Sequence, residues 1–303
     1  MSFPFDQTKT LLFISYFIQK GRLTSTIEGY LSGVRQEHLV RGWDVPYLRP
    51  TLVKALLTGN KNLANLAGKG LDRVAVEPTD LLQMKQKIKG LRDGPFDKRL
   101  VYTTMLLLFY GSLRVHEVLS EKATGYDPFS TLTWSDIRES RLKVNGNEVC
   151  LLILSIKSPK EAKGRTVTVE IFENKTSTCP VRAFRQLKRM LPPKASKSWP
   201  FSTKANGLLL TGKEFNSMLK QITKGIDKGP GRVIRSHSFR AGIPTLMARA
   251  GYPDDEIQRQ GRWRSSAFVR YCHLGRHNRW KDQLELSQRV PEMNIMVSCQ
   301  VFN

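Results

Sequence analysis

His237 and Arg240 are two residues whose types and spacing could bind a phosphate group. They lie three residues apart, so they share one side of a helix that Ser236 can begin. The free N–H groups at the start of a helix favour anions, and arginine binds phosphate oxygens through two parallel hydrogen bonds. The H-x-x-R pattern is short, and by itself it more often marks a pair of exposed side chains on a basic surface.

Arg114 is a second cation whose position indicates a partner or a function. It follows an apolar helix predicted over 100–110 and a Gly-Ser-Leu turn, and Glu117 lies one helical turn later. Burying an unpaired charge is costly, so Glu117 is the predicted partner of Arg114. A salt-bridged arginine with a structural role satisfies the same pattern.

Two further segments carry cationic or nucleophilic side chains. Strands predicted over 149–156 and 166–171 are joined by a basic loop at 157–165, which could reach into a DNA groove or simply be solvated. The cations of this loop are Lys157, Lys160, Lys163 and Arg165. Near the end of the chain, Gly261-Arg262-Trp263 precedes Tyr271 on a short predicted helix.

The elements that position these residues form two predicted domains. Residues 1–92 show apolar side chains at helical spacing and predict a small helical domain with polar, basic outer faces. The run Arg-Asp-Gly-Pro at 92–95 breaks this pattern and predicts the domain boundary. Residues 93–303 combine helices with the two strands. The predicted fold class is therefore mainly α with a small antiparallel β-sheet, an α+β arrangement.

The composition indicates a polyanionic partner. Lys plus Arg total 49 against 26 for Asp plus Glu, so the net charge is +23 and nucleic acid is favoured. A ribosome, an acidic protein or an anionic membrane surface would satisfy the same charge. Four widely separated cysteines indicate neither a zinc site nor disulfides, and they fit a reduced intracellular compartment. No cofactor, metal or membrane-spanning segment is expected.

Together these motifs make the chain resemble the tyrosine recombinase (phage integrase) superfamily over nearly its whole length. The segment T-S-T-I-E-G-Y-L-S-G-V-R at 24–35 resembles part of the helical core-binding domain. Residues 93–303 resemble the catalytic domain with a C-terminal docking segment. The resemblance is closest to the Crypton and DIRS types of eukaryotic mobile-element recombinase, which would place the protein in the nucleus, while phage-like relatives stay open.

The resemblance assigns roles to individual residues. The family's first arginine matches Arg114 in G-S-L-R-V-H-E, and Glu117 matches its acidic companion. The family's H-x-x-R motif matches His237 and Arg240, and its tyrosine nucleophile matches Tyr271 in F-V-R-Y-C.

Two assignments keep an alternative. The family's lysine matches Lys157 in S-I-K-S-P-K, with Lys160 as the second candidate. The family usually has His or Trp after the glycine that precedes the tyrosine. Here Arg262 occupies that position and Trp263 follows it, so either side chain could serve.

The resemblance implies a DNA strand transferase that needs neither metal nor ATP. Tyrosine is a weak nucleophile because its hydroxyl has a pKa near ~10, so nearby cations must favour its attack on the phosphate. The product would be a 3′-phosphotyrosyl bond, with Lys157 protonating the departing 5′ oxygen. The implied partners are double-stranded DNA and three further copies, a homo-tetramer on two DNA sites. The reaction would integrate or excise a mobile element, with no small-molecule substrate.

Two other functions are compatible with the same residues. A type IB topoisomerase uses similar chemistry but relaxes supercoils without a second duplex, and the helical N-terminal domain favours a recombinase. A domesticated DNA-binding protein would keep the fold and lose the reaction. The presence of every core catalytic residue type argues against such a loss.

Overall fold

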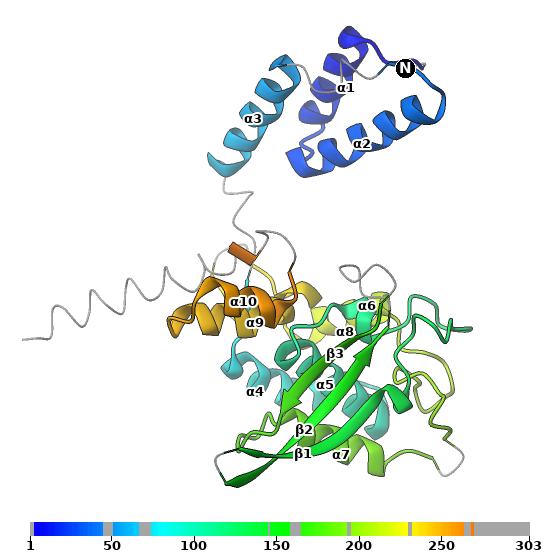
Figure 1. Cartoon of the computed structure of the whole chain (residues 1–303), viewed down its shortest axis with the longest axis vertical. Coiled ribbons are helices and arrows are strands. Elements are labelled where there is room, and N and C mark those ends of the chain that lie inside the picture. Colours follow the sequence, from blue (N-terminus) through cyan, green and yellow to red (C-terminus); the bar gives the residue numbers. More distant parts are fainter. Residues whose placement is uncertain are drawn as a thin grey trace, which may run out of the picture. The chain divides into compact units, whose positions relative to one another are not determined.

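The structure is a computed structural model that describes residues 3–44, 51–66, 74–144, 146–157, 165–192, 195–229, 232–263 and 268–269. Contacts divide the chain into two compact units, Met1–Arg73 and Val74–Asn303 (Figure 1). Tyr271 and Lys160 lie outside the described residues, as does the predicted docking segment at the C-terminal end.

The first unit consists of helices, as the apolar spacing predicts. Its described helices are α1 (Gln7–Gln19), α2 (Thr24–Val40) and α3 (Thr51–Leu66). One apolar cluster joins them and includes Ile14, Ile27, Leu31 and Val53. The N-terminal segment is attached to this cluster by buried His38, whose Nε2 accepts a hydrogen bond from the backbone N–H of Phe5 at 2.9 Å.

The two compact units divide before the boundary expected at residue 92. Helix α4 (Pro78–Lys87) and the 3-10 helix η2 (Ile88–Gly90) follow the division. Their apolar side chains Leu81, Met84 and Ile88 pack in the core of the second unit. The Arg-Asp-Gly-Pro break at 92–95 is therefore a turn between two helices of one unit. Helix α5 (Pro95–Tyr110) begins at its proline.

Helix α5 is the centre of the second unit. Every side chain from Leu100 to Phe109 is buried, because neighbouring elements cover the helix on all sides. The most extensive of its helix contacts are with α7 (Pro180–Arg189) and α9 (Ser236–Arg249). The other helices described here are α6 (Val115–Val118), η3 (Trp134–Asp136), α8 (Gly212–Ile222) and α10 (Asp254–Gly261). None of the described helices is long and apolar enough to cross a membrane.

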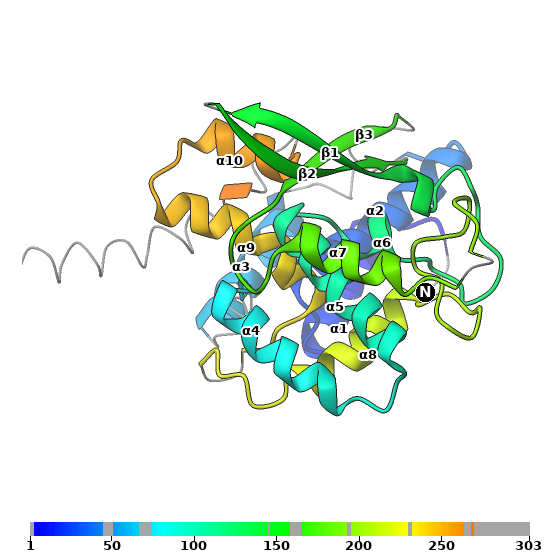
Figure 2. The same cartoon turned by 90° about the horizontal axis from the view of Figure 1, so that it is seen from below.

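A three-stranded antiparallel sheet lies along one side of these helices (Figure 2). Its strands are β1 (Ile137–Val144), β2 (Asn147–Ile156) and β3 (Val167–Phe172), in that order. The predicted fold class, mainly α with a small antiparallel sheet, is confirmed. Strand β1 was not predicted, because it is an edge strand whose sequence I-R-E-S-R-L-K-V is largely polar and lacks a strong apolar alternation.

Gly242 on α9 packs against the Phe109 ring of α5 and gives a test of this packing. A Cβ at Gly242 would overlap the Phe109 ring and lie 2.9 Å from the carbonyl oxygen of Val76. Helix propensity alone favours alanine over glycine by about 1 kcal/mol. We nevertheless expect Gly242→Ala to lower the free energy of unfolding by about 1–3 kcal/mol, because overpacking outweighs propensity. Urea denaturation measures the change.

The matched control is Gly212→Ala at the start of α8. Its Cβ would lie 3.6 Å from Val115, an ordinary contact, so the free energy of unfolding should stay within about 0.5 kcal/mol of the wild type. Equal effects of the two substitutions would contradict the close packing of α9 on α5.

Candidate active site

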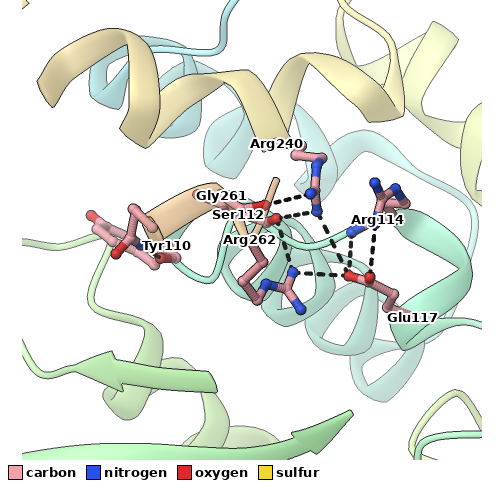
Figure 3. A network of polar contacts seen from close by, with 8 residues as sticks. Tyr110, Ser112, Arg114, Glu117, Arg240, Gly261 and Arg262 are labelled. Atoms are coloured by element: carbon pink, nitrogen blue, oxygen red, sulfur yellow. Dashed lines mark hydrogen bonds and ion pairs between the residues drawn. The ribbon is translucent and has the colours of Figure 1, made fainter. Parts of the chain in front are cut away.

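A tight turn after α5 fixes the first part of the site. At Gly111 a Cβ would lie 2.9 Å from the carbonyl oxygen of Leu107 and 3.0 Å from a methyl group of Ile171. Ser112 follows with φ of 47°, in the left-handed region that few side chains adopt. Arg114 then caps α6. The turn thereby holds the Ser112 carbonyl and the Arg114 side chain beside the same short helix (Figure 3).

The Glu117 carboxylate interacts with three arginines (Figure 3). Its Oε2 accepts from the backbone N–H of Arg114 at 2.9 Å, and its Oε1 accepts from the Arg114 guanidinium at 3.2 Å. Oε2 also accepts from Nη2 of Arg262 at 3.0 Å, and Nη1 of Arg240 lies 3.9 Å away. The Glu117 side chain is 1% exposed, and a carboxylate buried so deeply requires such partners. These four residues form the Glu117 cluster.

Arg240 is the buried member of the Glu117 cluster. Its side chain, carried by α9, is 0% exposed. Nη1 donates to the carbonyl oxygen of Ser112 at 2.7 Å, and Nη2 donates to that of Gly261 at 2.5 Å. The Trp263 ring centroid lies 5.1 Å from its Cζ, within the range of a cation–π interaction. These contacts fix the orientation of the guanidinium plane.

The end of α10 brings Arg262 and Trp263, the two candidates for the position after the glycine, to the Glu117 cluster. Gly261 has no room for a side chain, because a Cβ would overlap the Trp263 ring. Arg262 ends the helix in the left-handed region with φ of 55°, and its Nη2 also donates to the Ser112 carbonyl at 3.2 Å. Arg262 therefore contacts Glu117 directly, whereas Trp263 packs on Arg240.

The Glu117 cluster carries an excess of positive charge, since three guanidinium groups surround one carboxylate. The Arg114 and Arg262 side chains are 17% and 16% exposed, so part of this charge reaches the surface. A partly exposed group of fixed guanidinium donors is suited to bind an anion and to stabilise charge that develops on it.

Lys157 lies at the end of β2 and makes its contacts with the η3 region. Its Nζ forms an ion pair with Oδ2 of Asp136 at 2.6 Å and donates to the carbonyl oxygen of Pro128 at 3.0 Å. The same Asp136 oxygen accepts from the backbone N–H of Thr133 at 2.8 Å. The hydrogen bond from Thr133 thus fixes the Asp136 carboxylate, and this carboxylate positions Lys157.

The remaining predicted residues divide between described and undescribed parts of the chain. His237 is exposed on α9, three residues before Arg240. Sequence reasoning missed Asp136 and the carbonyl groups of Ser112 and Gly261. A signal for Asp136 exists, because T-W-S-D at 133–136 fits a capping box; main-chain carbonyls leave no such signal.

No protein-family model matches this sequence, and no curated protein has a significantly similar sequence. Several solved structures have a similar fold. The Tn1549 transposon integrase in complex with circular intermediate DNA is 12% identical, with a TM-score of 0.54 over 92% of this chain and 85% of that one. The XerH site-specific recombinase bound to its difH substrate is 14% identical, with a TM-score of 0.53 over 95% and 70%.

A lambda integrase dimer bound to a core site is also similar, at 12% identity and a TM-score of 0.51 over 88% of this chain and 80% of that one. At such identities the similarity concerns the fold. The chain has the fold of the tyrosine recombinases, as its motifs predict. The particular kinship with Crypton and DIRS elements stays a prediction.

Replacing Glu117 by Gln tests the charge balance of the cluster. The substitution leaves three guanidinium groups around a neutral side chain. Removing one partner of a buried ion pair lowers the free energy of unfolding by about 3–5 kcal/mol. Because two of the arginines are partly exposed, we expect a loss at the lower end of this range, about 3 kcal/mol. Urea denaturation of the variant measures this loss.

Glu148→Gln is the matched control. Glu148 pairs with Arg141 across the β1–β2 hairpin, with side chains 57% and 65% exposed, and it should contribute less than about 1 kcal/mol. If both variants lose the same small amount, the Glu117 carboxylate does not organise the cluster.

Proposed function

We propose that this protein is a site-specific DNA recombinase that cuts and rejoins DNA through Tyr271. The observation that carries the proposal is the Glu117 cluster, in which three arginines from α6, α9 and the end of α10 converge within the fold of the tyrosine recombinases. The proposed substrate is double-stranded DNA. That choice is supported by the net charge of +23 and by similar structures that were solved as DNA complexes.

In the proposed reaction the hydroxyl of Tyr271 attacks a DNA phosphate and displaces the 5′ oxygen. The bond to the 5′ oxygen breaks as a 3′-phosphotyrosyl bond forms, and reversal with a 5′-hydroxyl of another strand rejoins the DNA. The bond energy is retained, so the cycle consumes no ATP. Guanidinium groups of the Glu117 cluster bind the non-bridging oxygens and stabilise their added charge in the transition state. Exposed His237 donates to the same oxygens or relays a proton.

Lys157 is the proposed general acid, which protonates the leaving 5′ oxygen. Its ion pair with Asp136 supports this role, because it fixes the position of the ammonium group. The contacts with Asp136 and Pro128 also hold the lysine at the end of β2, from which the 157–165 loop departs.

The biological setting is proposed from the resemblance of the sequence to the recombinases of mobile elements. Four copies would assemble on two DNA sites, and the reaction would integrate or excise a mobile element. In a eukaryotic host this reaction would take place in the nucleus.

A nicked suicide DNA substrate tests the nucleophile. The wild-type protein should form a covalent protein–DNA adduct that survives SDS, in EDTA as well as in its absence. Tyr271→Phe should form no adduct but should still bind the substrate, since only the attacking oxygen is removed. Gel electrophoresis under denaturing conditions detects the adduct.

Tyr252→Phe is the control, because Tyr252 is exposed on the turn after α9 and should leave the adduct yield unchanged. An adduct that persists in Tyr271→Phe would falsify the assignment of the nucleophile.

A substrate with sulfur in place of the bridging 5′ oxygen tests the general acid. Thiolate leaves without being protonated, so it bypasses a missing acid. Lys157→Ala should slow cleavage of ordinary DNA by about 10²–10⁴-fold and should cleave the sulfur substrate at close to the wild-type rate. Single-turnover cleavage rates measure both effects.

Lys160→Ala is the comparison that decides between the two lysines. We expect it to cleave both substrates at nearly the wild-type rate. Rescue by sulfur in Lys160→Ala and not in Lys157→Ala would transfer the role of acid to Lys160.

A further inference from the structure

A second group of cations lies in the catalytic unit away from the Glu117 cluster. It consists of Lys85 on α4, Lys89 on η2, Arg99 on α5 and Arg182 on α7, here called the α7 cation cluster. Each of the other three lies near enough to the Lys85 ammonium group for its positive charge to lower the pKa of that group. In Figure 1 helix α7 lies at the lower end of the catalytic unit, and α6, α9 and α10 lie at its upper end.

Three cations of the α7 cation cluster donate hydrogen bonds to neutral acceptors. Lys85 Nζ donates to the carbonyl oxygen of Ser177 at 2.8 Å, and Arg99 Nη1 donates to Oε1 of Gln186 at 2.8 Å. Arg182 Nη2 donates to the carbonyl oxygen of Asn174 at 3.3 Å. Within the described part of the chain, no carboxylate forms an ion pair with any of the four cations.

The neighbouring Arg185 shows the contrast on the same helix. It forms ion pairs with Glu139 at 3.0 Å and with Glu173 at 3.5 Å. These carboxylates raise the pKa of Arg185, chiefly through the hydrogen bond that Arg185 donates to Glu139. Helix α7 therefore has one arginine, Arg185, that is paired with acids and another, Arg182, that donates to a main-chain carbonyl and pairs with none of the described carboxylates.

The surroundings of Lys85 make its charge unfavourable in the free protein. Partial burial is the first cause that lowers the pKa of Lys85, and the positive charges of Arg99, Arg182 and Lys89 lower it further. A bound anion would reverse the electrostatic part of this effect. An anionic ligand would therefore stabilise the positive charges of the α7 cation cluster.

Tyr102 gives an independent indication of a ligand. Its side chain is 4% exposed, and its hydroxyl has no hydrogen-bond partner among the described residues. The Lys85 ammonium lies 5.8 Å from the centre of its ring. Burial raises the pKa of Tyr102 and the neighbouring Tyr110 raises it further, whereas the positive charge of Arg99 acts in the opposite direction. Buried hydroxyls are rarely left unpaired, so this one leaves unused hydrogen-bonding capacity beside Lys85.

We infer that the α7 cation cluster binds a backbone phosphate of DNA, as a contact separate from the scissile phosphate at the Glu117 cluster. Arg99 of the α7 cation cluster lies near the start of α5, whereas the Glu117 cluster lies beyond the end of this helix. Arg99 and Tyr110 are separated along this helix by about 16 Å, at 1.5 Å per residue, and Arg114 follows beyond its end. Guanidinium and ammonium groups together match a phosphodiester, and the net charge of +23 favours a polynucleotide over a small anion.

Equilibrium DNA binding by the full chain tests this inference. Lys85→Gln combined with Arg182→Gln should weaken binding of a labelled 30-base-pair duplex by about tenfold at 0.1 M salt. It should also reduce the slope of log K against log salt by about 1, the amount expected for one lost phosphate contact. Fluorescence anisotropy titrations at several salt concentrations measure both quantities.

Arg141→Gln combined with Lys143→Gln is the matched control. It removes the same two charges from exposed positions on β1 and should change affinity by less than about threefold with an unaltered slope. Equal losses in the two double variants would overturn the inference, because they would reflect net charge alone. Lys89→Gln, at an exposed position, repeats the test with little risk to folding and should show a smaller loss of the same sign.

Inorganic phosphate at constant ionic strength distinguishes the source of the ligand. If it raises the melting temperature of the wild type but not of the Lys85/Arg182 double variant, and DNA affinity is equal in both, the site binds free phosphate and the inference is wrong. Covalent cleavage of the suicide substrate at saturating DNA should be unchanged in the double variant. Failure of this inference is therefore separable from failure of the proposed recombinase activity.

Discussion

One buried carboxylate makes the arginine cluster possible. Two like charges 4 Å apart repel by about 4 kcal/mol at the effective dielectric constant of a protein surface, and the cluster brings three such charges together. Glu117 offsets this repulsion and accepts hydrogen bonds from Arg114 and Arg262, while Arg240 lies 3.9 Å away. Because one negative charge cannot neutralise three positive ones, the cluster is held together and still attracts an anion.

The arginines of the cluster have different environments. Arg240 is fully buried and bound to two main-chain carbonyls, so its position is determined by the backbone. Arg114 and Arg262 lie at the edge of the cluster and retain some exposure. Ser112 connects the two environments, because its carbonyl accepts from both Arg240 and Arg262. A left-handed residue in the turn after α5 thus determines the geometry of the whole site.

Side chains that bind phosphate are visible in a sequence, whereas the main-chain groups that orient them are not. The contact between Arg114 and Glu117 could be predicted for two reasons. A buried cation needs a partner of opposite charge, and Glu117 lies one helical turn after Arg114. The bonds from Arg240 to the Ser112 and Gly261 carbonyls could not, since any residue type supplies a carbonyl. The roles of Tyr271 and Lys160 rest on the sequence alone.

Helical periodicity predicts most helices, a run of Leu, Ile and Val predicts β2, and strict alternation predicts β3. Edge strand β1 was not predicted, because its exposed face is polar. The sequence break at 92–95 was interpreted as a domain boundary because turn residues look alike inside and between domains. The packing of Leu81, Met84 and Ile88 in the core of the second unit shows that α4 belongs to that unit.

The wide sequence separation within the Glu117 cluster has a consequence for how the protein acquires its site. The bond from Arg262 to Glu117 joins residues 145 positions apart, and the bond from Arg240 to Ser112 spans 128. Contacts of such length form only after long chain segments have closed, and they are therefore late events in folding. A nascent or partly folded chain already carries the positive charge that attracts polyanions, but it lacks the assembled arginines. Attraction of polyanions thus precedes assembly of the Glu117 cluster, and completion of the tertiary fold is the step that separates the two.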